Sequence, residues 1–108
     1  MNKGQLGGMM KQIQQMQAKM EKIQAELEEM EVEGTSGGGM VKCTVNGKQE
    51  VLEIKIDPEV VNPDDVEMLQ DLIVAAVNQA RQKAQEIQQE QMSQLTGGLN
   101  LPGMNLPF

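Results

Sequence analysis

The sequence contains no histidine, tryptophan or tyrosine, and its one aromatic residue is Phe108. Without histidine, the chain lacks the usual proton shuttle at neutral pH and the commonest metal ligand, which argues against metalloenzymes and histidine-based nucleophilic catalysts. A single cysteine, Cys43, excludes an intramolecular disulfide and a four-thiolate zinc site. No apolar run is long enough to span a bilayer. We therefore expect a soluble cytosolic protein that is not an enzyme and that uses no cofactor, metal, membrane or small-molecule substrate.

The net charge is −7, from 16 acidic and 9 basic residues. If this charge were evenly spread, it would disfavour nucleic-acid binding, because DNA is a polyanion. The charge is uneven, however. Residues 1–20 contain three lysines and no acid, residues 21–79 contain fourteen acids and four bases, and residues 80–108 contain two of each. A segment that attracts DNA is thus separated along the chain from a segment that repels it.

Apolar residues in the first third of the chain recur at alternating spacings of three and four, which is typical of a heptad seam. The seam consists of Leu6, Met9, Ile13, Met16, Met20, Ile23, Leu27 and Met30. It predicts a helix over about 6–30. A similar spacing predicts a C-terminal helix that reaches about residue 95, and we interpret Asn62 and Pro63 as its N-cap and first residue.

The middle of the chain changes to a period of two, which predicts strands. Val41, Cys43 and Val45 share one face, so we expect the Cys43 thiol to be buried and unreactive. The dipeptide Asn46-Gly47 predicts a two-residue type I′ turn, which would place Cys43 opposite Glu50. A further strand is predicted over 32–36, with a turn at the three glycines 37–39.

These elements predict an α+β fold with the order α-β-β-β-α: a long N-terminal helix, a three-stranded antiparallel meander and a long C-terminal helix. The C-terminal helix is longer than the sheet, so we expect its second half to pack against the N-terminal seam as a protruding antiparallel arm. Unpaired strand edges and uncovered apolar surface favour a homodimer with two such arms. We expect one domain over residues 1–95 and a flexible tail, rich in glycine and proline, over 96–108.

The basic residues of the two predicted arm helices are the candidate contacts to the phosphates of duplex DNA, namely Lys3, Lys11, Lys19, Lys22, Arg81 and Lys83. Scattered lysines on a helix can equally form an ordinary solvated face. An alternative function is a coiled-coil adaptor or holdase that binds proteins between its arms without binding DNA, since the chain has ten methionines.

Several segments of the sequence resemble the YbaB/EbfC family of nucleoid-associated proteins. They are residues 10–17 (MKQIQQMQ), 39–42 (GMVK), 53–61 (EIKIDPEVV), 65–78 (DVEMLQDLIVAAVN) and 98–103 (GLNLPG). The resemblance implies a small, tweezer-like homodimer in the bacterial cytoplasm and nucleoid. Its protruding helices would bind duplex DNA with little sequence preference and alter DNA conformation or gene expression. The resemblance supplies no compact motif for the DNA contacts, so the six basic residues depend on the charge argument alone.

Overall fold

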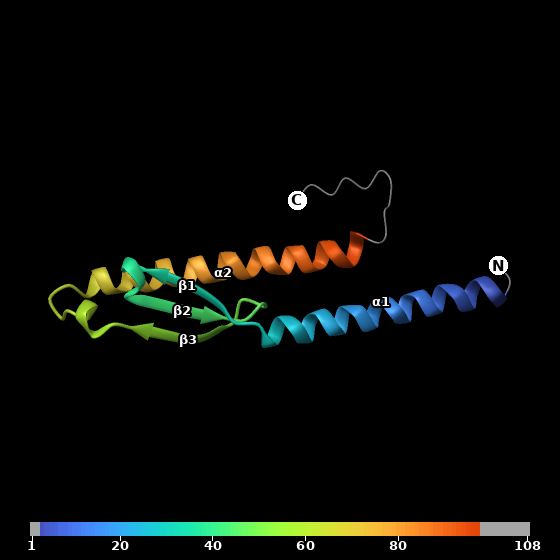
Figure 1. Cartoon of the computed structure of the whole chain (residues 1–108), viewed down its shortest axis with the longest axis horizontal. Coiled ribbons are helices and arrows are strands. Elements are labelled where there is room, and N and C mark those ends of the chain that lie inside the picture. Colours follow the sequence, from blue (N-terminus) through green and yellow to red (C-terminus); the bar gives the residue numbers. More distant parts are fainter. Residues whose placement is uncertain (1–2, 98–108) are drawn as a thin grey trace.

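The computed structural model describes residues 3–97, with side chains described for residues 6–95. Residues 98–108, which include most of the predicted tail, lie outside the described part. The predicted order of elements is confirmed (Figure 1): α1 (Lys3–Glu29), β1 (Val32–Ser36), the 3-10 turn η1 (Gly37–Gly39), β2 (Val41–Val45), β3 (Val51–Ile56), the 3-10 turn η2 (Pro58–Val60) and α2 (Val66–Gly97).

The three strands form an antiparallel meander in the order β1-β2-β3. The turn between β1 and β2 depends on its three glycines, because all three have positive φ angles, a conformation that side chains disfavour. Cys43 lies opposite Gly34 on one side and Ile54 on the other. The predicted three-stranded sheet and the bounds of its first strand are therefore confirmed.

The predicted two-residue turn between β2 and β3 is wrong. Cys43 pairs with Ile54 rather than Glu50, and the connection is a five-residue loop, Asn46–Glu50, next to a register shift at Thr44 and Val45. The positive φ angle of this loop falls on Gln49, not on Asn46 or Gly47. Gly47 is required for a different reason, since a Cβ atom there would lie 2.9 Å from the Leu27 Cα atom.

Helix α2 covers one face of β1 and β2, and this contact forms the core. Val41, Cys43 and Val45 are fully buried on the sheet side, and Ala76, Ala80 and Ala84 are fully buried on the helix side. Small side chains at every fourth position let the helix approach the sheet closely. At the same contact, strand β1 has a glycine, Gly34, where a Cβ atom would overlap backbone atoms of Ala76 and Ala80.

The start of α2 differs from the prediction. Asn62 accepts a hydrogen bond from the Asp64 N–H (3.0 Å) and so forms a turn, whereas the helix begins at Val66. Its N-cap is Asp65, whose carboxylate accepts a hydrogen bond from the Met68 N–H at 3.1 Å. Proline at position 63 therefore precedes the helix instead of starting it.

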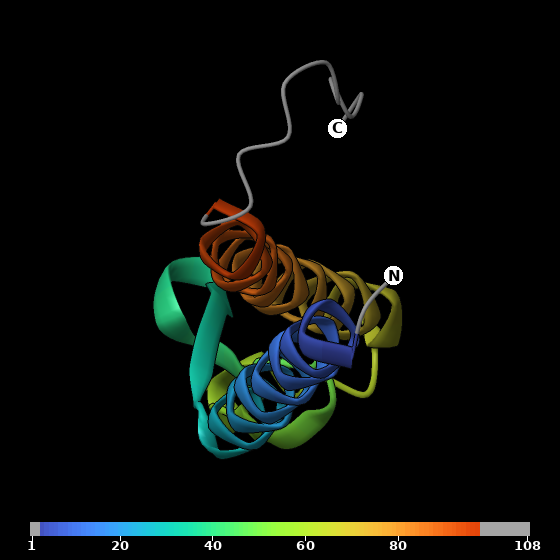
Figure 2. The same cartoon turned by 90° about the vertical axis from the view of Figure 1, so that its right-hand side faces the viewer.

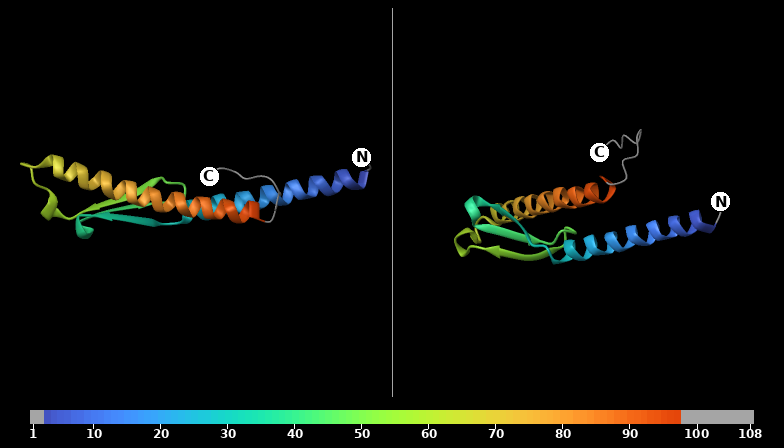
Figure 3. Two further views of the ribbon diagram at one scale, coloured as in Figure 1. Left: turned by 90° about the horizontal axis from the view of Figure 1, so that it is seen from above. Right: turned by 45° about the vertical axis from the view of Figure 1, so that its right-hand side comes forward.

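Helices α1 and α2 run antiparallel, but α1 extends beyond the end of α2 (Figures 1 and 3). Viewed along the molecule, they lie as two distinct rods (Figure 2). Leu27, at the inner end of the seam, is fully buried, whereas Leu6, Met9, Ile13 and Met20 are 43–54% exposed. The prediction that the whole seam packs against α2 is therefore wrong for these four residues, because α2 is not positioned to cover them. The result is an elongated molecule of 74 × 27 × 17 Å.

Candidate nucleic-acid interface

The predicted site residues lie on the two long helices, and all five with a described side chain are exposed: Lys11, Lys19 and Lys22 on α1, and Arg81 and Lys83 on α2. Lys3 is the first residue of α1, and its side chain lies outside the described part. The structure thus brings the α1 lysines together on the helix that protrudes from the body.

Lys11, Lys19 and Lys22 form a stripe along α1. At 3.6 residues per turn their positions fall within about 80° of one another around the helix axis, and they extend over about 16 Å of its length. The apolar seam that contains the buried Leu27 lies on another face of the helix, about 125° away on average. The lysine stripe therefore points away from the side of α1 that contacts the body.

Within residues 6–95, no carboxylate forms an ion pair with a lysine of this stripe, although Glu26 and Glu29 lie on the same side of α1. Three ion pairs form among residues 6–95, and they join Lys42 to Glu33, Lys48 to Glu28, and Lys55 to Glu53. None of these pairs involves an α1 lysine or Arg81. The α1 stripe is therefore available to an external anion such as a phosphate.

The two basic residues of α2 are not equivalent. They are two positions apart, about 200° around the helix, and so lie on opposite flanks. Lys83 turns toward the sheet, where its Nζ donates a hydrogen bond to the Glu33 carbonyl oxygen (3.1 Å), and nearby the Thr35 N–H donates to the Gln79 side chain (2.7 Å). These contacts cover the outer edge of β1. Arg81 has no such contact in the described part of the chain.

The acidic residues of η2 and the start of α2 lie at the opposite end of the molecule from the N-terminus of α1 (Figure 1): Asp57, Glu59, Asp64, Asp65, Glu67 and Asp71. All six are exposed. Six of the fourteen acids of residues 21–79 therefore form an acidic pole far from the lysine stripe, whereas four others lie on α1 itself: Glu21, Glu26, Glu28 and Glu29.

Sequence patterns placed Leu27 in the apolar seam but did not reveal its contact with the β2–β3 loop, which holds α1 in place. Leu27 is buried where α1 meets the β2–β3 loop, and its carbonyl oxygen accepts a hydrogen bond from the Gly47 N–H at 2.7 Å. The Asn46-Gly47 dipeptide was visible in the sequence, but its pattern predicted a turn and not a contact with a distant helix.

The described part of the chain has few features of metal binding, thiol reactivity or membrane insertion. Within residues 6–95, no group of three or more histidine, cysteine, aspartate or glutamate side chains is arranged to hold a metal ion. Cys43 is buried, as expected, and its burial raises the pKa of the thiol. None of the described helices is both long enough and apolar enough to cross a membrane.

Comparisons with known proteins agree over nearly the whole chain. The sequence profile of the YbaB/EbfC DNA-binding family matches residues 1–99. A nucleoid-associated protein of Paramagnetospirillum magneticum is 59% identical over 104 residues, covering 95% of this chain and 97% of the relative. Another, from Alkaliphilus metalliredigens, is 57% identical over 99 residues, covering 92% and 87%.

A solved structure is also similar: the crystal structure of an uncharacterized protein from Helicobacter pylori superposes with a TM-score of 0.75 at 25% sequence identity, and the match covers 90% of this chain and 99% of that one. The fold inferred from the residues thus has an experimentally determined counterpart. With the profile match and the closely similar relatives, the conclusion is direct: this chain belongs to the YbaB/EbfC DNA-binding family.

Proposed function

We propose that this protein is a nucleoid-associated protein of the cytoplasm that binds duplex DNA with low sequence specificity through the lysines of α1. One observation carries the proposal: Lys11, Lys19 and Lys22 are exposed, free of ion pairs and aligned on one face of a protruding helix. The family and the names of its relatives support DNA as the partner. The comparisons give no support to the alternative, a coiled-coil adaptor or holdase.

The proposed mechanism is electrostatic. Lysine ammonium groups replace counterions along the phosphate backbone, which gives affinity without reading the bases. Aromatic residues, which some proteins insert between base pairs, are absent from residues 3–97, and residues that could read base edges are sparse on the arms. Low specificity is the expected consequence, and binding should change little between random duplexes of equal length.

We further propose that the chain acts as a homodimer and that β3 contributes to the interface. The face of β3 that continues the core is not covered by α2, and Val51, Leu52, Ile54 and Ile56 are all exposed. The outer edge of β3 has no partner strand within residues 3–97, unlike β1, whose edge contacts Gln79 and Lys83. A second copy would cover this apolar edge, which is otherwise a site of aggregation.

The direct test is a titration of random-sequence duplex with the wild-type chain and two matched double variants. Lys11→Gln/Lys19→Gln removes two charges from the α1 stripe, and Lys42→Gln/Lys55→Gln removes two from the sheet. We expect the first variant to lose most of its affinity and the second to retain it. Equal losses would show that total charge, not the stripe, determines binding, and salt-resistant capture of unfolded protein without DNA binding would favour the holdase.

A further inference from the structure

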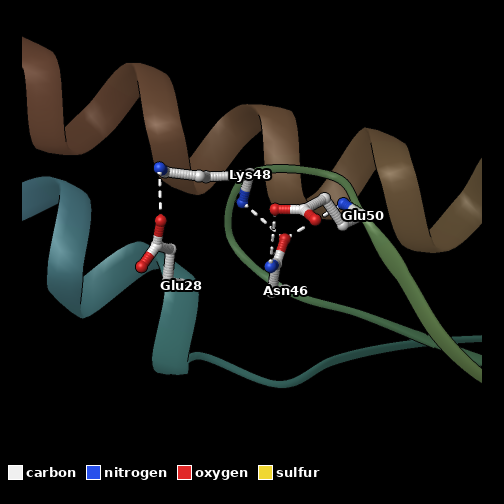
Figure 4. A network of polar contacts seen from close by, with 4 residues as sticks. All are labelled: Glu28, Asn46, Lys48 and Glu50. Atoms are coloured by element: carbon white, nitrogen blue, oxygen red, sulfur yellow. Dashed lines mark hydrogen bonds and ion pairs between the residues drawn. The ribbon is translucent and has the colours of Figure 1, made fainter.

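The β2–β3 loop, Asn46–Glu50, contacts the C-terminal end of α1 and the second half of α2. Figure 4 shows the loop and its contact with Glu28 of α1. On the α1 side, the Gly47 N–H donates to the Leu27 carbonyl oxygen (2.7 Å), and the Lys48 Nζ is 2.7 Å from a Glu28 carboxylate oxygen. On the α2 side, the Gln49 amide donates to the Gln88 side chain at 3.4 Å. A single loop therefore joins the two helices.

The loop is internally braced by Asn46, which is 4% exposed. Its side-chain oxygen accepts hydrogen bonds from the N–H groups of Lys48 (2.9 Å) and Glu50 (3.0 Å), and its side-chain NH₂ donates to the Glu50 carboxylate (Figure 4). The Asn46 N–H also donates to the Glu50 carbonyl oxygen at 3.0 Å. A buried polar side chain with all these partners holds a loop in one conformation.

The fit between loop and α1 leaves no free space. Leu27 is fully buried, and a Cβ atom at position 47 would lie 2.7–2.9 Å from Leu27 atoms, two of them backbone. Leu27 is the one buried residue among 6–29, and only Met16, Ile23 and Gln24 of that range are half-buried. The contact with the loop is the firmest point at which the direction of α1 can be set.

We propose that the Asn46–Glu50 loop is a positioning element that fixes the angle between α1 and α2, and through it the placement of the lysine stripe. The effect on DNA depends on the proposed function, whereas the effect on the angle does not. Lys11 lies sixteen residues from Leu27, about 24 Å along the helix. A rotation of about 15° at the loop would move Lys11 by about 6 Å, half the width of a major groove of about 12 Å.

The angle can be measured with spin labels at Gln15→Cys on α1 and Gln89→Cys on α2, both of them exposed positions. Native Cys43 is buried and should stay unlabelled. Excess unlabelled chain ensures that each distance arises within one protomer. We expect Lys48→Glu and Glu28→Lys, which each place like charges at the ion pair, to shift or broaden the label distance by about 5 Å, given the lever of about 18 Å and a rotation of about 15°.

The rescue variant is the decisive one. Glu28→Lys/Lys48→Glu restores an ion pair at wild-type net charge, and we expect it to restore both the label distance and the duplex affinity. Lys55→Glu serves as the charge-matched control, because it breaks the exposed pair with Glu53 on β3 and should leave the distance unchanged. Glu28 is exposed and Lys48 is half-buried, so the pair contributes modestly to global stability and these variants should remain folded.

Gly47→Ala tests the same contact through shape, with Gly8→Ala as its control because a Cβ atom at Gly8 meets nothing within 4 Å. We expect the first to change the distance and the second to leave it unchanged. Wild-type distances in both single charge variants, or no recovery in the double variant, would overturn the proposal. An altered distance with unaltered affinity would remove the link to DNA. If wild type bound no duplex, the proposed function would fail, and the distances would still decide the role of the loop.

Discussion

The salt dependence of DNA binding can be predicted from the number of free lysines. Each α1 helix presents three exposed, unpaired lysines in the described part, Lys11, Lys19 and Lys22, so the proposed dimer would offer six. Each neutralised phosphate contributes about −0.9 to the slope of log affinity against log salt, so six contacts give a slope of about −5. Raising the salt from about 50 to about 200 mM should then weaken binding roughly a thousandfold.

The double variant Lys11→Gln/Lys19→Gln would remove four of the six contacts expected for the proposed dimer. Its slope should fall to about −2, and the same rise in salt should weaken binding only about tenfold. Fluorescence anisotropy with a labelled random-sequence duplex across a salt series measures both slopes. The matched variant Lys42→Gln/Lys55→Gln should keep the wild-type slope. Equal slopes for wild type and the arm variant would refute the assignment of the phosphate contacts to α1, whatever the absolute affinities.

Three further predictions concern the core, the thiol and the dimer. Gly34→Ala should cost about 3 kcal/mol or more in urea unfolding, since its Cβ atom would overlap backbone atoms of α2, while Gly8→Ala should cost nothing. Burial raises the pKa of the Cys43 thiol, so the folded state holds this proton more tightly than the unfolded chain does, and this contribution to stability is lost as the pH rises above about 9. Wild type should therefore lose more free energy of unfolding than Cys43→Ala between about pH 7.5 and 9.5. Equal losses would contradict the burial of the thiol. Ile54→Lys, at an exposed position on β3, should give a folded monomer in analytical ultracentrifugation, and a dimer of unchanged stability would exclude this edge from the interface.

The sequence predicted those features that depend on local patterns. Alternation at Val41, Cys43 and Val45 identified both a strand and its buried face, and the three glycines 37–39 identified a turn. It failed where distant elements meet. Asn46-Gly47 suits a tight hairpin turn, but in the structure the Gly47 N–H donates a hydrogen bond to the Leu27 carbonyl oxygen, and this contact with α1 accompanies a longer loop. Local patterns in a single sequence do not predict which helix end contacts which loop.

The same limit applies to the candidate site. The count of charges showed that residues 1–20 are basic, and helical periodicity applied to the predicted helix would have placed Lys11, Lys19 and Lys22 near one another, although the sequence analysis listed them only as scattered lysines. The engagement of Lys83 with the Glu33 carbonyl oxygen was not, because it depends on how α2 lies across β1. Basic residues that the sequence lists together therefore differ in the structure: Lys83 contacts the edge of β1, whereas the other described candidates make no contact with a strand.

An acidic protein can bind DNA if its repulsive charges lie beyond the screening distance from its binding surface. Lys11 is eighteen residues from the end of α1, about 27 Å, and the acidic pole lies beyond the sheet on the far side (Figure 1). The Debye length is about 8 Å at physiological salt but about 30 Å at 0.01 M. The acids of the pole should therefore be unimportant at physiological salt and should weaken DNA binding only when salt is low.

This reasoning can be tested with Glu67→Gln/Asp71→Asn, which removes two exposed charges from the pole and spares Asp65, the N-cap of α2. We expect the variant to bind duplex as wild type does at about 0.15 M salt and more tightly than wild type at about 0.01 M. Anisotropy titrations at the two salt concentrations provide the measurement. An equal gain in affinity at both would mean that DNA contacts the acidic end of the molecule, and the protruding helix would then no longer account for how a chain of net charge −7 binds a polyanion.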